Sequence, residues 1–146
     1  GTGRVIDMSS DFSDVLGELW ETIHSRREEI IHRIQPEEWV GYWFIRQQPS
    51  PAFCYFASLE VDSPDDIPNG LMLKTIPHSL YAVFQEKQRG EIGGPGGYAY
   101  KTWLPESDYV VNPEVPGDLE VYRFSEDSGP RSECEILIPV KPKNSI

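Results

Sequence analysis

The sequence is poor in basic residues. In 146 residues, 13 lysines and arginines stand against 24 aspartates and glutamates, which gives a formal net charge of −11. A protein that binds a nucleic-acid backbone needs clustered lysine and arginine side chains to neutralise the phosphates. We therefore expect no direct binding to DNA. An acidic protein instead attracts cations and raises their concentration near its surface.

Cysteine is scarce as well, and long apolar runs are missing. The two cysteines, Cys54 and Cys134, cannot build a disulfide framework, and no CxxC motif or histidine-rich spacing indicates a metal centre. No apolar run reaches the length of a membrane span, and no basic segment followed by an apolar one opens the chain as in a secretory signal. We expect a soluble, reduced, cytoplasmic protein without cofactor, metal or membrane contact.

The glycine-rich stretch 90–109 (GEIGGPGGYAYKTWLPESDY) lacks the signature of a phosphate-binding loop. Its glycines are followed by tyrosine, whereas the GxxxxGK[ST] motif requires Lys followed by Ser or Thr. No GxSxG motif or Cys–His pairing indicates a catalytic nucleophile either. Glycine disfavours helix, so the stretch delays a short helix that is predicted from about Gly97 to Leu104 and stopped by Pro105. We interpret GGPGG as a flexible rim beside a pocket.

One strong helical pattern lies near the N-terminus. Ser9, Ser10 and Asp11 offer capping oxygens before it, and Pro36 follows its end. A polar face opposite the apolar one is typical of a helix that packs on a core. The apolar residues at the three-four spacing of one helix face are Phe12, Val15, Leu16, Leu19, Trp20, Ile23, Ile30, Ile31 and Ile34.

Aromatic and β-branched runs predict the strands. The runs lie at 39–45, 52–61, 71–86 with a kink at Pro77, 118–124 and 134–140, and a first strand near residues 4–7 is nearly absent. The order strand–helix–strand–strand therefore occurs twice, in halves 4–61 and 71–141 joined by the acidic connection 62–70. We predict a single α+β domain with a mostly antiparallel sheet and its helices on one side.

Four motifs in a fixed order resemble the GyrI-like effector-binding domains, which also serve AraC-type and MerR-type regulators as ligand-sensing modules. The stand-alone, integron-associated effector-binding proteins are the most similar group. The resemblance covers about residues 38–141 and implies two strand–helix–strand–strand units with pseudo-twofold symmetry. The chain departs from the family at GGPGG, where relatives begin a helix, and at its short first strand. The motifs are KTIPHSLYAVFQEKQRG (74–90), YAYKTWLPESDY (98–109), DLEVYRF (118–124) and CEILIPVK (134–141).

The resemblance also implies a ligand site. Strand alternation places Glu120 on one face with Tyr122 and Phe124, and in similar family members the glutamate of this motif lies at the floor of an aromatic pocket that receives cations. A lipophilic cation would supply the charge that a carboxylate among rings lacks. Gly41 either leaves room for a flat ligand or marks a bulge, and Glu60 is a weaker second acid. The predicted ligand-binding residues are Glu120, Tyr122, Trp39, Trp43, Phe56, Tyr81, Tyr100 and Trp103; each aromatic could equally be a core residue.

The sequence leaves three functions open. The first is a stand-alone effector module that captures lipophilic aromatic, cationic compounds. The second, implied by the resemblance, is a hydrolase of strained cyclopropane-bearing genotoxins, in which Glu120 would activate water. The third is a protein that binds and inhibits DNA gyrase through its acidic surface. No helix-turn-helix is legible, so a role in transcription regulation would need a DNA-binding partner or a lost fusion.

Overall fold

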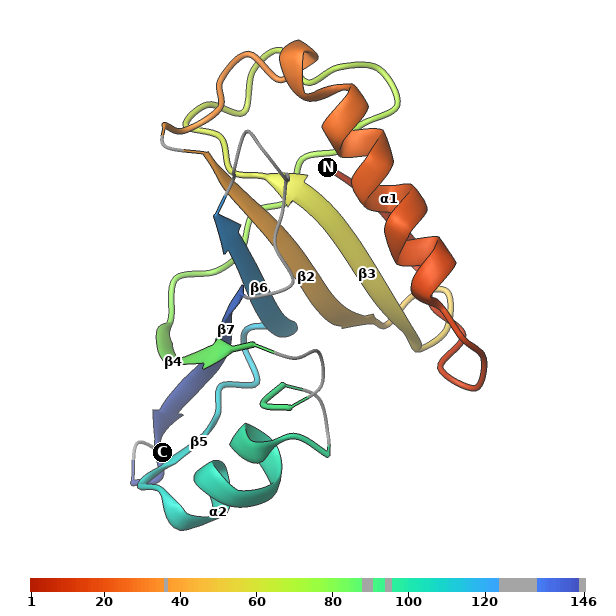
Figure 1. The fold of residues 1–146 in the computed structure, drawn as a ribbon. Helices are drawn as coiled ribbons and strands as arrows, with labels where there is room; N and C mark the ends of the chain where they lie inside the picture. Colours follow the sequence, from red (N-terminus) through yellow and green to blue (C-terminus); the bar gives the residue numbers. More distant parts are fainter. Residues whose placement is uncertain (36, 88–90, 94–95, 124–133, 145–146) are drawn as a thin grey trace.

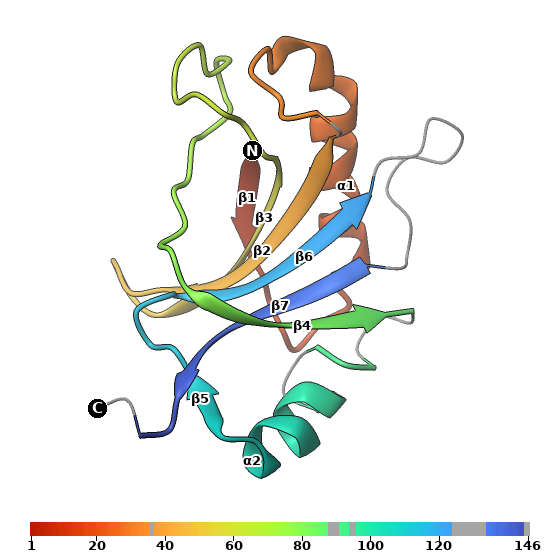
Figure 2. The ribbon, with the colours of Figure 1, turned by 90° about the vertical axis from the view of Figure 1, so that its left-hand side faces the viewer.

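The fold is centred on one antiparallel sheet. The computed structural model describes residues 1–35, 37–87, 91–93, 96–123 and 134–144. The strands follow the order β1-β3-β2-β6-β7-β4, and β5 pairs with β7 off this path (Figures 1 and 2). Every strand pair in this part of the chain is antiparallel. The strands are β1 (Thr2–Val5), β2 (Glu38–Arg46), β3 (Ala52–Leu59), β4 (Leu80–Glu86), β5 (Tyr109–Val111), β6 (Gly117–Arg123) and β7 (Cys134–Pro142).

The two halves repeat one order of elements. In the first half β1 is followed by α1 (Ser13–Ser25), the short 3-10 turn η1 (Arg27–Glu29), β2 and β3. In the second half β4 is followed by the π-helical turn η2 (Ala99–Trp103), α2 (Leu104–Glu106), β5, β6 and β7. The sheet order is symmetric about the contact between β2 and β6, so the predicted α+β class and pseudo-twofold arrangement are confirmed. Strand β5 was not predicted.

Helix α1 is shorter than its apolar pattern suggested. It ends at Ser25, and the chain then turns through η1, so that Ile30 is buried while Ile31 is 64% exposed. The turn brings Arg27 and Arg33 onto the buried carboxylate of Glu37, whereas a continued helix would carry the two arginines away from it. Pro36, expected just after the helix, lies outside the described residues.

The start of α1 differs from the expected cap in its details. Only Asp11 contributes, because its Oδ1 accepts the Ser13 backbone N–H at 3.0 Å. The hydroxyl of Ser9 donates to the Asp7 carboxylate at 2.6 Å, and that of Ser10 donates to the Asp7 carbonyl at 3.1 Å. Both serines therefore stabilise the preceding turn and leave the helix N-terminus to Asp11.

The second helix runs two residues further than expected, because Pro105 does not stop it. Pro105 lies in the first turn of α2, where a missing N–H costs little. Gly97 is required by a close approach, since a Cβ atom there would overlap the carbonyl oxygens of Ile92 and Gly93. The central residues of GGPGG, 94–95, lie outside the described residues.

Both helices cover the same face of the sheet, as predicted. Residues of α1 (Leu16, Leu19, Ile23) and of the second helical segment (Ala99, Leu104) belong to one buried cluster with Trp39, Tyr55, Tyr122, Ile136 and Ile138. The opposite face carries a smaller cluster of Tyr42, Phe56 and Leu119, against which Ile76 packs. Ile76 belongs to the segment between β3 and β4, whose last part runs to β4 on the side of the sheet away from α1 (Figure 2). No helix in the described ranges is long and apolar enough to cross a bilayer.

Candidate functional site

A pocket of about 420 Å³ lies on the helix-covered face, near the centre of the sheet. We call it the central pocket. Its walls come from the chain before α1, from β2, β6 and β7, from the glycine-rich segment and from loop 111–117. The aromatic side chains that line it include Phe12, Trp43, Phe53 and Tyr100, and its acidic side chains are Glu86, Asp118 and Glu120. Among the described residues that line it there is no lysine, arginine or histidine.

Glu120 lies at the base of this pocket on β6, where only 8% of it is exposed. Its Oε1 accepts a hydrogen bond from the Tyr55 hydroxyl at 2.9 Å, and the Tyr55 oxygen in turn accepts the Trp20 indole N–H at 3.0 Å. Burial, and next the negative charge of Glu120, raise the pKa of Tyr55 well above its usual value, so Tyr55 stays a protonated donor. Two residues, Trp20 of α1 and Tyr55 of β3, thus orient the buried carboxylate of Glu120.

Gly41 makes this arrangement possible. It lies directly opposite Glu120 in the β2–β6 register, and a Cβ atom there would overlap the Tyr55 hydroxyl and lie 2.8 Å from Glu120 Oε1. The register of β2 is unbroken on both sides, so Gly41 marks no bulge. The space that its missing side chain leaves is taken by the Tyr55–Glu120 hydrogen bond.

Asp118 and Tyr100 form a second polar pair in the pocket. Asp118 lies two residues before Glu120 and on the same face of β6, and the Tyr100 hydroxyl donates to its Oδ2 at 2.5 Å. Burial raises the pKa of Asp118 to about 6, although the hydrogen bond from Tyr100 acts in the opposite direction. Burial and the Asp118 carboxylate also raise the pKa of Tyr100. The pair connects β6 to the second helical segment.

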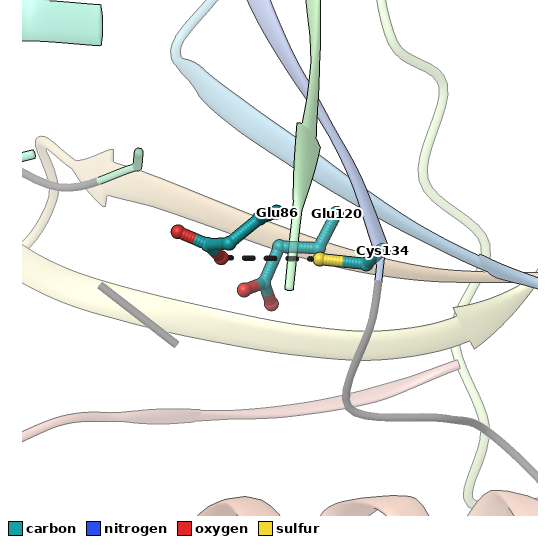
Figure 3. A group of neighbouring side chains, drawn as sticks. All are labelled: Glu86, Glu120 and Cys134. Carbon is teal, nitrogen blue, oxygen red and sulfur yellow. Dashed lines mark hydrogen bonds between the residues drawn. The ribbon is translucent and has the colours of Figure 1, made fainter. Parts of the chain in front are cut away.

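Glu86 is the third acid, at the end of β4 and only 3% exposed. Its Oε1 accepts the backbone N–H groups of Ile92 and Gly93 at 2.9 and 3.0 Å, which fixes the first part of the glycine-rich segment. Its Oε2 lies 3.9 Å from Cys134 Sγ. Figure 3 shows Glu86, Glu120 and Cys134 converging from three strands.

This geometry can be set beside known proteins. The sequence profile of the integron-associated effector binding proteins matches residues 1–140. The chain belongs to this family. It is also similar to the transcriptional regulator BrlR of Pseudomonas aeruginosa PAO1, with 32% identity over 130 residues, which are 87% of this chain and 47% of that relative. The chain spans about half the length of this curated relative. Membership of the effector-binding family confirms the resemblance that the four motifs indicated and supports a small-molecule binding module.

The structure of this effector-binding protein brings together only part of the predicted ligand set. Glu120, Trp43 and Tyr100 line the central pocket. Trp39 and Tyr122 share the same face but are buried in the core beneath α1, where Trp20 packs on both rings.

The other three predicted aromatics lie elsewhere. Trp103 packs against Phe84 and stacks on Tyr109, outside the lining of the central pocket. Phe56 and Tyr81 lie on the opposite face of the sheet, where they line a separate groove of about 710 Å³. Glu60 is exposed and lines that same groove. Three of the eight predicted residues thus line the central pocket, and two line the groove on the opposite face.

Four polar residues of the site were not identified from the sequence: Trp20, Tyr55, Glu86 and Asp118. Strand alternation could have found two of them. Asp118 follows from Glu120 by a step of two, and Tyr55 lies on the face of β3 that Phe56 does not share. Glu86 gave no such signal, because its position depends on how β4 pairs with β7.

Proposed function

We propose that this effector-binding protein captures lipophilic aromatic cations in the central pocket, with Glu120 as the charged anchor. One observation carries the proposal: the pocket combines three acidic side chains with aromatic walls, and its described lining has no basic side chain. Small-molecule sites are typically apolar cavities of this size with a few polar groups that select the ligand. The residues at the base of this pocket select positive charge.

The buried carboxylate of Glu120 accounts for the preference for a cation. The hydrogen bond from Tyr55 orients Glu120 but, as a bond from a neutral hydroxyl, does not cancel its charge. A buried carboxylate is stabilised further when an opposite charge binds beside it. An organic cation would supply that charge, and each favourable contact with a ring such as that of Trp43 would add about 0.5–2 kcal/mol. A neutral or anionic compound of equal size gains neither contribution.

Tryptophan fluorescence can monitor the binding of matched compounds, because Trp43 lines the pocket. We expect a planar aromatic cation to quench the emission saturably and an isosteric neutral compound to bind much more weakly. Glu120→Gln keeps the size of the side chain and removes its charge, so affinity for the cation should fall about 10- to 100-fold, as for the loss of a charge-assisted contact of about 1.5–3 kcal/mol.

Glu60→Gln is the matched control, since it removes one acid from the groove on the other face. Equal affinity of wild type and Glu120→Gln for the cation, or an equal loss in both variants, would contradict the assignment of Glu120.

Hydrolysis is the second candidate, because Glu120, positioned by the hydrogen bond from Tyr55, offers a carboxylate in the pocket that would activate water. A strained electrophile added in the same assay distinguishes the two functions. Product formation that stops in both Glu120→Gln and Tyr55→Phe indicates an enzyme, whereas saturable binding without product indicates capture. A contribution to transcription regulation, as the name of the P. aeruginosa relative suggests, would couple capture of the ligand to a DNA-binding domain.

A further inference from the structure

Glu86, Glu120 and Cys134 form a buried cluster at the base of the central pocket. They come from β4, β6 and β7, and their exposed fractions are 3%, 8% and 5%. One carboxylate oxygen of each glutamate and the Cys134 sulfur all lie within 4.8 Å of one another (Figure 3). The cluster therefore combines two kinds of metal ligand, carboxylate and thiol, contributed by three strands of one sheet.

The geometry of the cluster favours a cation. Ionised carboxylates held this close repel each other, and a cation bound between them would relieve that repulsion. Glu86 Oε2 accepts a long hydrogen bond from the Cys134 thiol at 3.9 Å, drawn as the dashed line in Figure 3. The two side chains thus already point at each other inside the cluster.

We propose that Glu86, Glu120 and Cys134 bind one divalent metal ion of borderline softness, with Zn²⁺ as the best fit. A thiolate disfavours Mg²⁺ and Ca²⁺, which prefer all-oxygen sites, and suits Zn²⁺, which accepts sulfur and carboxylate oxygen together. Bonds of about 2.0–2.3 Å would draw the three donor atoms roughly 1 Å closer to one another, within the reach of glutamate side-chain rotation. The thiol proton is released to solvent when the ion binds.

The surroundings of the cluster match those of a metal site. Each glutamate is already held through its other contacts: Tyr55 donates to Glu120, and the backbone N–H groups of Ile92 and Gly93 donate to Glu86. Such hydrogen bonds orient metal ligands and commonly affect metal affinity. Both glutamates line the central pocket, so an ion has an entry path and a fourth coordination position facing the cavity.

Metal binding is measured on the full chain after a chelator has removed any bound ion. Titration with Cd²⁺, a spectroscopic substitute for Zn²⁺, should produce a sulfur-to-metal charge-transfer band in the ultraviolet that saturates at one ion per chain, and Zn²⁺ should displace it. Cys134→Ser should abolish the band and weaken Zn²⁺ binding in equilibrium dialysis at least about tenfold. Glu86→Gln should weaken binding similarly, while its remaining oxygen can still accept the N–H groups of Ile92 and Gly93.

Cys54 provides the matched control, as the second buried thiol of the chain, on β3. Cys54→Ser should retain the band and the stoichiometry of wild type. No band in wild type, a band that persists in Cys134→Ser, or one that disappears in Cys54→Ser would overturn the proposal. A band unaffected by Glu86→Gln, with unchanged Zn²⁺ affinity, would overturn the assignment of that ligand.

The metal site does not rest on the proposed function, and the two can fail separately. Because Zn²⁺ and an organic cation would both neutralise Glu120, we expect saturating Zn²⁺ to weaken binding of the organic cation. Cys134→Ser should leave organic-cation binding to the metal-free protein unchanged. Cation binding without a metal band therefore refutes the metal site alone, and a metal band without cation binding refutes the capture function alone.

Discussion

Gly41 occupies a position in β2 where a side chain would displace the hydrogen-bonded pair of Tyr55 and Glu120. An added Cβ would overlap the Tyr55 hydroxyl and crowd Glu120. We expect Gly41→Ala to lower the free energy of unfolding by about 1–3 kcal/mol, as overpacking in a core does, and to weaken cation binding because Glu120 loses its position. Urea unfolding followed by circular dichroism measures the first effect.

Two further variants test whether overlap with the Tyr55 hydroxyl causes the loss of stability. Tyr55→Phe in the Gly41→Ala background removes the overlapping oxygen and should recover part of the lost stability. Gly17→Ala, in the exposed middle of α1 with no heavy atom near the added methyl group, should stabilise the protein by about 0.5–1 kcal/mol. A Gly41→Ala protein as stable as wild type would show that the site tolerates a side chain.

At the scale of elements, the end of α1 is fixed by ion pairs that the helical pattern did not reveal. Arg27 and Arg33 both donate to Glu37, which is 6% exposed, at 2.7–2.9 Å. Burial alone would raise the pKa of Glu37, but the hydrogen bonds and charges of the two arginines hold it below its usual value. The pKa is thus lower in the folded chain than in the unfolded one. This contribution to stability is present above about pH 4.5, the usual value, and is lost as the pH falls through the folded-state pKa.

Glu37→Gln therefore should lower the free energy of unfolding by about 2 kcal/mol at pH 7, where the carboxylate is ionised. The difference between wild type and variant should shrink as the pH falls below about 4.5, and urea unfolding at a series of pH values measures it. Glu29→Gln breaks the exposed pair with Arg26 and should cost less at every pH. If the difference in free energy of unfolding between wild type and Glu37→Gln stayed constant with pH, the ion pairs would not be its cause.

The elements that sequence reasoning predicted well are those set by local pattern. Strands β2, β3, β6 and β7 are rich in aromatic and β-branched residues, and their positions matched to within two residues. The helix face was also correct, but the end of α1 depends on Glu37, a contact partner beyond the helix. Segment 71–79 reads as extended, yet β4 begins only at Leu80, where pairing with β7 starts. Local pattern indicates that a segment is a strand, and partners decide where it begins and ends.

The site was only partly predictable for the same reason. Glu120 was identified by its motif, but its contact with Tyr55 requires the opposed Gly41, and this follows from the β2–β6 register. Glu86 reaches the pocket because β4 adds to the outer edge of β7. Phe56 was predicted to line the same pocket as Glu120, but its side chain lies on the opposite face of the sheet. It is the neighbour of Tyr55 in β3, and one step along a strand moves a side chain to the other face.

At the scale of the whole molecule, the two halves share one sheet and one core, so we propose that they unfold as a single unit. Residues 38–44 of β2 pair with residues 117–123 of β6 across the centre, and the main buried cluster joins Ile23 and Tyr55 of the first half to Ile136 and Ile138 of the second. Neither half can expose its side of this core without exposing the other half, which makes the transition cooperative.

Fluorescence can test this because three of the four tryptophans, Trp20, Trp39 and Trp43, lie in the first half. In a Trp103→Phe variant the emission reports the first half alone, whereas far-ultraviolet circular dichroism reports both halves. We expect the two probes to give coincident urea transitions with the same midpoint and slope. Separate midpoints would show that the β2–β6 contact joins two independent units. The central pocket takes Glu86 and Glu120 from the second half, and Trp43 and the hydrogen bond from Tyr55 from the first. With independent units, the pocket would therefore form only when the two halves dock.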